Sequence, residues 1–277
     1  NNVGGNIRAL GKGSFAHGWA GYDNIASGNG SHVEGSGNIA EGFCTHAEGT
    51  YSINDSSVSA EIKGAYAHKV GNGINFMNRS NAYTLDWQGN GTFAGTVSSA
   101  TGADYAEYFE WKDGNPNNED RVGYFVKLKD GKIVLCEDFD TPLGIVSATP
   151  AIIGDSGEMH WQGKFLTDDF GRIQYQDVIV PAETDEDGNI VTEEHIETQP
   201  ILNPQWNPEQ EYIPRKDRAE WSAVGVLGKL IVYDDGTLQS GDICRCGDGG
   251  KAVKSIENGY TVLRRVSDDK ILIWFKG

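Results

Sequence analysis

Proline is scarce in this chain, whose 277 residues contain 8 Pro but 37 Gly. Collagen needs glycine at every third position together with abundant proline, so the composition excludes a collagen-like helix. The glycine content suits β-structure with tight turns or closely approaching backbones. No apolar run reaches the length of about 18 residues that crosses a bilayer, and no signal peptide is visible. Because the first residue is Asn1, we expect a piece of a longer protein.

Positive charge is also scarce, with 23 Lys and Arg against 40 Asp and Glu and a net charge of −17. This field repels polyanions, so nucleic acid is excluded as a partner. The four cysteines are too few and scattered for a disulfide framework. Cys244 and Cys246 are too close for the usual zinc pair. We therefore expect ordinary thiols, synthesis in a reducing cytosol, and neither a bound metal nor a cofactor.

A glycine-periodic repeat fills the first part of the chain. Each unit reads polar-x-small-x-Gly, and the last four glycines are seven residues apart; the units are Ser14–Gly18, Asn24–Gly28, Ser31–Gly35, Asn38–Gly42 and Thr45–Gly49. A coiled-coil heptad needs two apolar positions and helix-forming residues, whereas these units are rich in Gly, Ser and Asn. Alternating small and polar residues predict short strands, which bury a face only by stacking.

This pattern resembles the head repeats of trimeric autotransporter adhesins over about residues 10–52. The resemblance implies a left-handed β-roll built from three chains, and we assign residues 1–52 to it. Because Ala and Val are too small to fill a wide core, we expect a narrow roll packed against two partner chains. His17, His32 and His46 lie near one end of the segment. They are either ligands of a metal or anion on a threefold axis, or solvent-facing or stacked polar side chains.

Residues 53–102 predict a β-rich neck of short strands separated by glycine-rich turns. The run Gly91–Val97 resembles the linker that precedes processing domains in phage tail fibres. We expect the neck to continue the threefold packing of the chains from the repeats to the C-terminal domain.

The rest of the chain predicts a mostly β domain. Hairpins are expected at 125–135, with a turn at 129–132, at 230–238, with a turn at 234–236, and at 260–275, with a turn at 267–269. Residues 181–220 are rich in proline and acidic residues, Glu186 among them. They form either an extended arm embracing a neighbouring subunit or a solvated insertion.

The segment Gly102–Asn115, continuing through Arg121, resembles the peptidase G2 family of phage appendage proteins. Further matches are Gly154–Ser156, Trp161–Lys164, Pro214–Arg215, Glu220–Trp221 and Val224–Lys229. The resemblance runs from about residue 98 to the end of the chain and implies an intramolecular chaperone domain, assigned to 103–277. In that family the chain trimerises, guides folding of the upstream spike and cuts itself before the Asp of this motif. Here that bond is Ala103–Asp104.

The residues suit such chemistry. Asp104 and Glu107 are three positions apart and share a face if the stretch is helical. Two close carboxylates separate in pKa, which gives Glu107 as the base and Asp104 as the local acid or orienting group. Arg121 would hold a carboxylate or stabilise an oxyanion. The competing interpretation is the ordinary start of an amphipathic element.

Position 103 departs from the pattern that a hydroxyl nucleophile needs. A serine before the bond would attack the preceding carbonyl, and Ala103 closes that route. Three explanations stay open: a natural variant that uses water, a natural variant that does not cut, and a deliberately inactivated sequence. We expect the chain to be intact or slow to cut.

Three functions compete. The first is a trimeric assembly module of a phage or prophage tail spike or neck appendage, made in the host bacterial cytoplasm and carried on the virion, with the upstream spike polypeptide as its partner. The second is a receptor-binding tip for a host cell-surface glycan, favoured by 7 Trp and 11 Tyr. The third, a glycan-degrading enzyme, needs an acid pair across a groove that the sequence does not offer.

Overall fold

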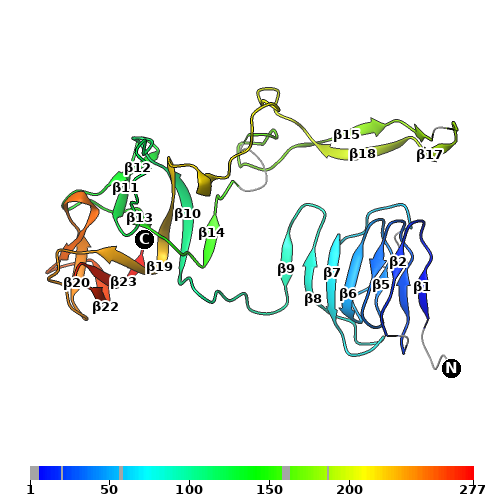
Figure 1. The fold of residues 1–277 in the computed structure, drawn as a ribbon, viewed down its shortest axis with the longest axis horizontal. Coiled ribbons are helices and arrows are strands. Elements are labelled where there is room, and N and C mark those ends of the chain that lie inside the picture. Colours follow the sequence, from blue (N-terminus) through cyan, green and yellow to red (C-terminus); the bar gives the residue numbers. More distant parts are fainter. Residues whose placement is uncertain (1–5, 20, 56–58, 158–162, 186) are drawn as a thin grey trace. The chain divides into compact units, whose positions relative to one another are not determined.

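A computed structural model describes residues 6–19, 21–55, 59–157, 163–185 and 187–277 (Figure 1). Trp161 and Glu186, named above, lie outside these residues. The chain divides into two compact units, Asn1–Ser98 and Ser99–Gly277. The described residues form strands and only two short 3-10 helices, which confirms a mostly β protein. None of the helices in this part of the chain has the length and apolar character to cross a membrane.

The first unit stacks short parallel strands in two sheets. One sheet contains β1 (Ile7–Ala9), β3 (Asn24–Ala26) and β5 (Ile39–Ala40). The other begins with β2 (Phe15–Ala16), β4 (His32–Val33) and β6 (His46–Thr50). Because Ile25 pairs with Ile39 and His32 with His46, one full coil takes two of the seven-residue units.

Glycine sets the corners of each coil. A Cβ on Gly28 would lie 1.9 Å from the carbonyl oxygen of Gly42, and one on Gly35 would lie 2.0 Å from that of Gly49. Any side chain at these positions would collide with the backbone of the next coil. The seven-residue glycine period is therefore the spacing of corners, with two corners to a coil.

Asparagine side chains join successive coils where the strands end. Asn24 and Asn38 are both fully buried. The backbone amide of Asn38 donates to the Oδ1 of Asn24 at 3.0 Å, and the backbone amide of Ser52 donates to the Oδ1 of Asn38 at 2.8 Å. These side chains satisfy backbone groups that a turn would otherwise leave unpaired inside the protein.

The interior of the first unit is filled by small side chains from one chain. Ala26, Val33, Ala40 and Ala47 come from both sheets, form a single cluster and are fully buried. One chain is therefore enough to bury these small side chains. The expected packing of the roll against two partner chains stays a prediction.

Histidines form a row on the outer face of the second sheet. The rings of His32 and His46 stack at 4.5 Å and those of His46 and His68 at 4.7 Å. Burial, together with the neighbouring His68 and His32, lowers the pKa of His46 below its usual range. The stacking agrees with the second interpretation given above, and the ring contacts leave the question of a bound ion open.

The second sheet continues past residue 52 into the neck. It is extended by β7 (His68–Asn72), β8 (Asn81–Leu85) and β9 (Gly91–Phe93), which confirms the short strands expected there. Strand β7 pairs in parallel with β6, so the neck belongs to the same unit as the repeats.

The second unit is built on a ten-stranded sheet. Its strands are β10 (Asp104–Glu110), β11 (Phe125–Lys129), β12 (Lys132–Leu135), β13 (Gly144–Val146), β14 (Ile152–Gly154), β19 (Trp221–Tyr233), β20 (Ile243–Cys246), β21 (Ala252–Lys254), β22 (Tyr260–Ser267) and β23 (Lys270–Lys276). The hairpins β11–β12 and β22–β23 confirm two predictions. The hairpin expected at 230–238 is wrong, because β19 instead pairs with β10, β13 and β23.

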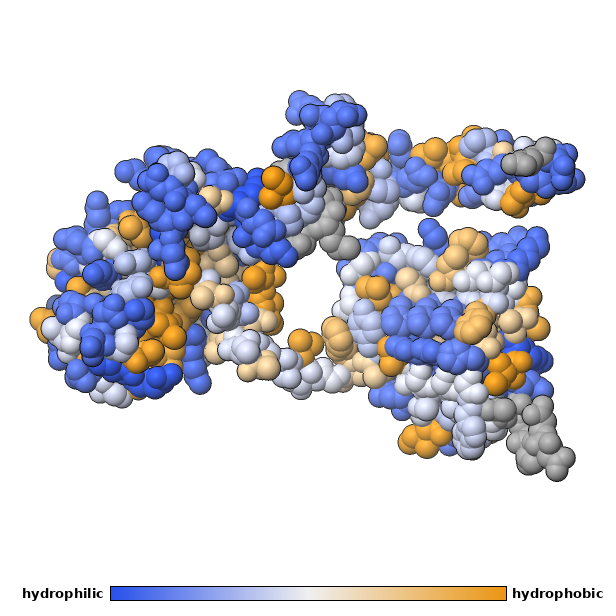
Figure 2. All heavy atoms as spheres, in the orientation of Figure 1, coloured by the Kyte–Doolittle hydropathy of each residue, from blue (hydrophilic) through white to orange (hydrophobic). Residues whose placement is uncertain are grey.

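Two smaller ribbons come from the region between β14 and β19. Strand β15 (Tyr175–Val180) pairs with β18 (His195–Pro200), and β16 (Glu183–Thr184) pairs with β17 (Ile190–Thr192). Neither pair has a third strand among the described residues. Figure 2 shows hydrophobic side chains along the β15–β18 ribbon. Ile179 and Ile196 are exposed on these strands.

Candidate functional site

The Ala103–Asp104 bond lies at the start of β10, where backbone hydrogen bonds hold it on both sides. The carbonyl oxygen of Ala103 accepts the amide of Lys229 at 3.2 Å, and that of Asp104 accepts the amide of Ala151 at 2.8 Å. The two donors come from β19 and from the segment before β14. An amide aimed at a carbonyl oxygen polarises it and stabilises the charge that develops there during attack.

Gly228 allows β19 to approach this bond. Its φ is +127°, and a Cβ built on it would lie 2.4 Å from the carbonyl oxygen of Ala103 and 2.7 Å from the Cα of Asp104. Both the backbone conformation and the contact therefore require glycine. The approach positions the Lys229 amide against the Ala103 carbonyl.

The side chain of Asp104 is buried beneath the bond. Its Oδ2 has no hydrogen-bond partner and lies against Gly225, where an added Cβ would come within 2.7 Å of it. Burial raises the pKa of the Asp104 carboxyl above its usual range, while a hydrogen bond with Ser147 opposes the rise. The raised pKa widens the pH range over which the Asp104 carboxyl holds a proton that it can give up.

A cavity of about 430 Å³ opens beside the bond. Its polar lining consists of Thr101, Asp104, Asp120, Ser147, Thr149, Lys229, Tyr233 and Lys270. This volume exceeds that of several water molecules, each of which takes about 30 Å³ of liquid. Water or a lining hydroxyl thus has room to reach the bond.

Glu107 lies on the other face of β10, because side chains three residues apart in a strand point in opposite directions. The helical arrangement that would bring Glu107 beside Asp104 is therefore wrong. Glu107 instead accepts a hydrogen bond from the hydroxyl of Tyr105 at 2.6 Å, and this interaction raises the pKa of Tyr105.

Arg121 is engaged away from both carboxylates. It donates to Asp113 through Nη1 at 2.9 Å and Nη2 at 2.6 Å, and its Nη2 also donates to Glu119 at 2.9 Å. Its guanidinium lies 4.5 Å from the ring of Trp111, a buried residue. Hydrogen bonding with Asp113 raises the pKa of Arg121 and lowers that of Asp113. The described contacts are those of a structural ion pair.

Three residues beside the bond had no role in the sequence predictions: Ser147, Ala151 and Lys229. Lys229 is the last residue of the Val224–Lys229 match, and Gly228 before it was the available signal. Nothing in the local sequence marks Ser147 or Ala151, which reach the bond through pairing of distant segments.

The geometry allows one division of labour among groups of this chain. The Lys229 amide stabilises charge on the Ala103 carbonyl oxygen, and neutral Asp104 supplies a proton to the nitrogen that leaves with it. A hydroxyl on residue 103 would lie next to the carbonyl of Gly102. Its absence from Ala103 therefore affects attack on the Gly102–Ala103 bond. The nucleophile that attacks the Ala103 carbonyl would instead be water or the hydroxyl of Ser147.

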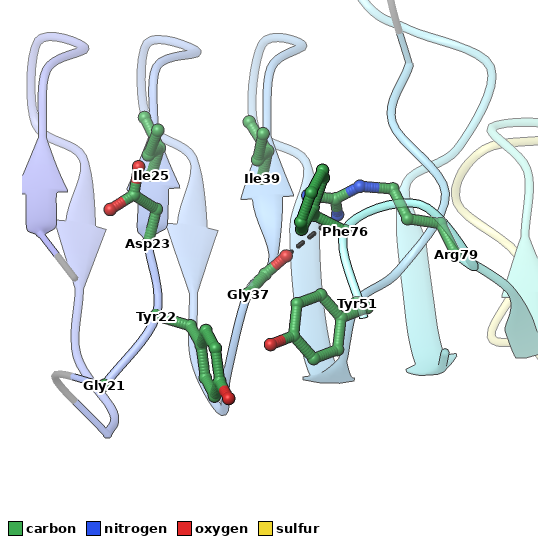
Figure 3. A pocket seen from close by; sticks show the side chains of 9 residues that line it. All are labelled: Gly21, Tyr22, Asp23, Ile25, Gly37, Ile39, Tyr51, Phe76 and Arg79. Atoms are coloured by element: carbon green, nitrogen blue, oxygen red, sulfur yellow. Dashed lines mark hydrogen bonds between the residues drawn. The ribbon is translucent and has the colours of Figure 1, made fainter. Parts of the chain in front are cut away.

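A second cavity, of about 300 Å³, lies on the first unit (Figure 3). Tyr22, Tyr51 and Phe76 line it, and the rings of the two tyrosines meet edge to face at 5.4 Å. Arg79 is fixed beside them, because its Nη1 donates to the carbonyls of Gly37 and Ser52 at 2.8 and 2.9 Å.

Comparison with known proteins identifies the class of this chain. Residues 50–269 match the peptidase G2 family, described as the IMC autoproteolytic cleavage domain. The chain therefore belongs to the peptidase G2 family. The match begins at residue 50, at the end of β6, earlier than the resemblance noted from the sequence.

Relatives and a solved structure agree with this assignment. The pre-neck appendage protein of Bacillus phage B103 is 34% identical over 155 residues, 56% of this chain and 16% of that protein. The putative phage-related protein YobO of Bacillus subtilis is 35% identical over 183 residues, 65% of this chain and 21% of that protein. The crystal structure of the pre-mature bacteriophage phi29 gene product 12 has a TM-score of 0.63 at 22% identity, covering 98% of this chain and 40% of that one. This likeness shows a shared fold.

Replacing Gly228 by Ala tests the close approach at the bond. We expect G228A to destabilise the second unit by about 1–3 kcal/mol from overpacking, with backbone strain in addition. Urea unfolding of the full chain measures the change. The matched control is G241A, since Gly241 has a φ of +90° but no atom within 4 Å of an added Cβ. Equal losses in the two variants would show that the contact with Ala103 contributes nothing.

Proposed function

We propose that this chain is the C-terminal assembly module of a phage or prophage appendage, made in the host bacterial cytoplasm and carried on the virion. It trimerises, guides folding of an upstream spike polypeptide and slowly hydrolyses its own Ala103–Asp104 bond. The observation that carries the cleavage is the bond's setting. An amide donates to its carbonyl oxygen, a buried acid follows it, and a cavity with hydroxyl and charged groups in its lining opens beside it.

The reaction consumes one water molecule. Its oxygen bonds to the carbonyl carbon of Ala103 while the carbon–nitrogen bond to Asp104 breaks. The departing nitrogen takes up a proton from the Asp104 carboxyl, which recovers it from the attacking water. The products are a carboxyl group on Ala103 and an amino group on Asp104. Because the bond is already held in place, orientation replaces substrate binding.

Trimerisation draws support from the β15–β18 ribbon. Ile179 and Ile196 are cross-strand partners on one face of the ribbon, with exposed fractions of 64% and 70%. A two-stranded ribbon alone is marginally stable in water. An exposed isoleucine pair on such a ribbon is best buried against another subunit, as the arm interpretation of this region expects.

Self-cleavage should slow as pH rises. Only neutral Asp104 donates a proton, so the rate should fall as pH rises through the raised pKa of this carboxyl. The D104N variant should cleave at least about a hundredfold more slowly, since a hundredfold is the lower end of what a positioned proton donor contributes. Intact-mass spectrometry over days measures the fragments 1–103 and 104–277.

The control for this experiment is D169N, which removes a carboxylate from an exposed position. Hydrolysis in water enriched in ¹⁸O should label the new carboxyl group of Ala103. Rapid, complete cleavage, an unlabelled product, or D104N cutting as fast as D169N would contradict the proposed chemistry.

Light scattering during size-exclusion chromatography tests trimerisation separately. The expected mass is about 90 kDa, three times the 30.1 kDa of the chain. Introducing charge with I179D/I196D should lower it toward the single-chain value. Q176D is the control, because Gln176 is exposed on the opposite face of the same strand. A well-folded wild-type chain that runs as a single copy would contradict trimerisation and leave the cleavage experiment valid.

The aromatic cavity on the first unit supports a second function, binding of a host cell-surface glycan. Tyrosine and phenylalanine rings offer faces for a sugar, and Arg79 lies beside them (Figure 3). The cleavage site plays no part in this function.

Glycan-array binding tests the second function. F76A should lose binding without loss of stability, because Phe76 is 72% exposed. I74A removes a side chain that is 82% exposed and lies outside the cavity, and should bind like the wild type. Absence of binding by the wild-type chain, or equal binding by F76A and I74A, would leave assembly and processing as the sole proposed function.

A further inference from the structure

The outer face of the second sheet in the first unit brings imidazole and carboxylate groups together. His32, His46 and His68 occupy the same register position on β4, β6 and β7. Two residues further along, Glu34 directly after β4 and Glu48 on β6 point to the same face, because side chains of an extended chain alternate. The result is a row of histidines beside a row of carboxylates.

Distances divide these residues into two clusters. In the first, the Nε2 of His17 lies 2.9 Å from Glu34. In the second, the Nε2 of His68 lies 3.3 Å from Glu48. Within each cluster, one ligand atom from each of three residues lies within 4.8 Å of the other two.

One ring nitrogen of each histidine in the row lacks a hydrogen bond. The Nε2 atoms of His32, His46 and His68 are buried and have no hydrogen-bond partner. Buried polar atoms without partners are uncommon in folded proteins and call for an explanation. Carboxylates lie 3.9 Å from the Nε2 of His46 and 3.3 Å from that of His68, too far or too poorly aligned to satisfy them. A cation between the imidazoles and the carboxylates would satisfy both.

The ends of the row are closed by aromatic rings. Phe15 meets His32 edge to face at 5.1 Å, and Tyr83 meets His68 in the same way at 5.9 Å. These contacts restrict how the outer imidazoles turn. The ligand groups are therefore held near one another before any ion arrives, which lowers the entropy lost on binding.

We propose that this face binds two divalent transition-metal ions of the zinc class, one in each cluster. The first ion is held by His17, His32 and Glu34, and the second by His46, Glu48 and His68. Imidazole nitrogen selects zinc, nickel or copper over calcium and magnesium, which prefer oxygen ligands alone. Bonds of about 2.1 Å put tetrahedral ligand atoms about 3.4 Å apart, so side-chain rotation closes each cluster. Water completes the fourth position.

Each ion would join neighbouring coils of the stack. The first cluster connects the segment after β2 with β4, and the second connects β6 with β7. The ions would therefore stabilise the first unit, and the site acts independently of the Ala103–Asp104 bond.

Metal analysis of the untagged full chain tests the proposal. After removal of metal with a chelator and dialysis against micromolar zinc, mass spectrometry of the metal content should give two zinc ions per chain. H32N and H68N should each keep one ion, and H32N/H68N should keep none. H195N is the control, because His195 lies on β18, outside both clusters, and should keep two. Cobalt in place of zinc should give the visible absorption bands of four-coordinate cobalt.

Thermal unfolding gives a second measurement. Zinc should raise the unfolding temperature of the wild type and of H195N, and should leave that of H32N/H68N unchanged. If a histidine variant fails to fold, as judged by circular dichroism, E34Q and E48Q replace it, since each removes a ligand with almost no change in shape. Zinc retained equally by the wild type and H32N/H68N, or calcium bound in preference to zinc, would overturn the proposal.

Discussion

The contact between glycine and the backbone of the next coil is the constraint on which the first unit depends. Gly28 against Gly42 and Gly35 against Gly49 set how closely successive coils stack. The interior of these coils is filled by Ala and Val, and the buried Asn24 and Asn38 pair the backbone groups left inside. In the next coil the fully buried Lys69 takes the position that pairs with Ala47, and its Nζ donates to the carbonyl of Ile53. The histidines and the rings of the cavity instead lie on the outer faces.

A glycine also allows close backbone approach at the proposed cleavage site. Gly228 lets the backbone of β19 approach the Ala103 carbonyl, as a glycine lets one coil approach the next. In the repeats the close approach builds a regular stack. At Ala103 it places one amide against one carbonyl, beside a carboxyl whose burial raises its pKa. A side chain at position 228 would disturb folding and the alignment of the bond together.

Local sequence patterns predicted the strands and turns that residues close together in the chain determine. The glycine period, the small interior residues and the hairpins of β11–β12 and β22–β23 were accessible because turn residues and alternation lie close together in the chain. Asp104 and Glu107 could not be placed, since their spacing fits one face of a helix or opposite faces of a strand. Pairing with β19 decides between the two, and β19 lies more than a hundred residues away. The same long-range pairing places Lys229 beside the bond. The register of that pairing cannot be read from either segment alone.

This dependence on distant pairing has a consequence for the proposed cleavage. The Ala103 carbonyl acquires its donor only when β19 has paired with β10, and Asp104 is desolvated only when the surrounding sheet has closed over it. In the unfolded chain the carboxyl has its ordinary pKa in water and the carbonyl faces solvent. The groups that would break the bond therefore come together only in the folded second unit. A domain that guides folding and then cuts itself needs a way to delay the cut until folding is complete, and this arrangement makes the fold itself the condition for cleavage.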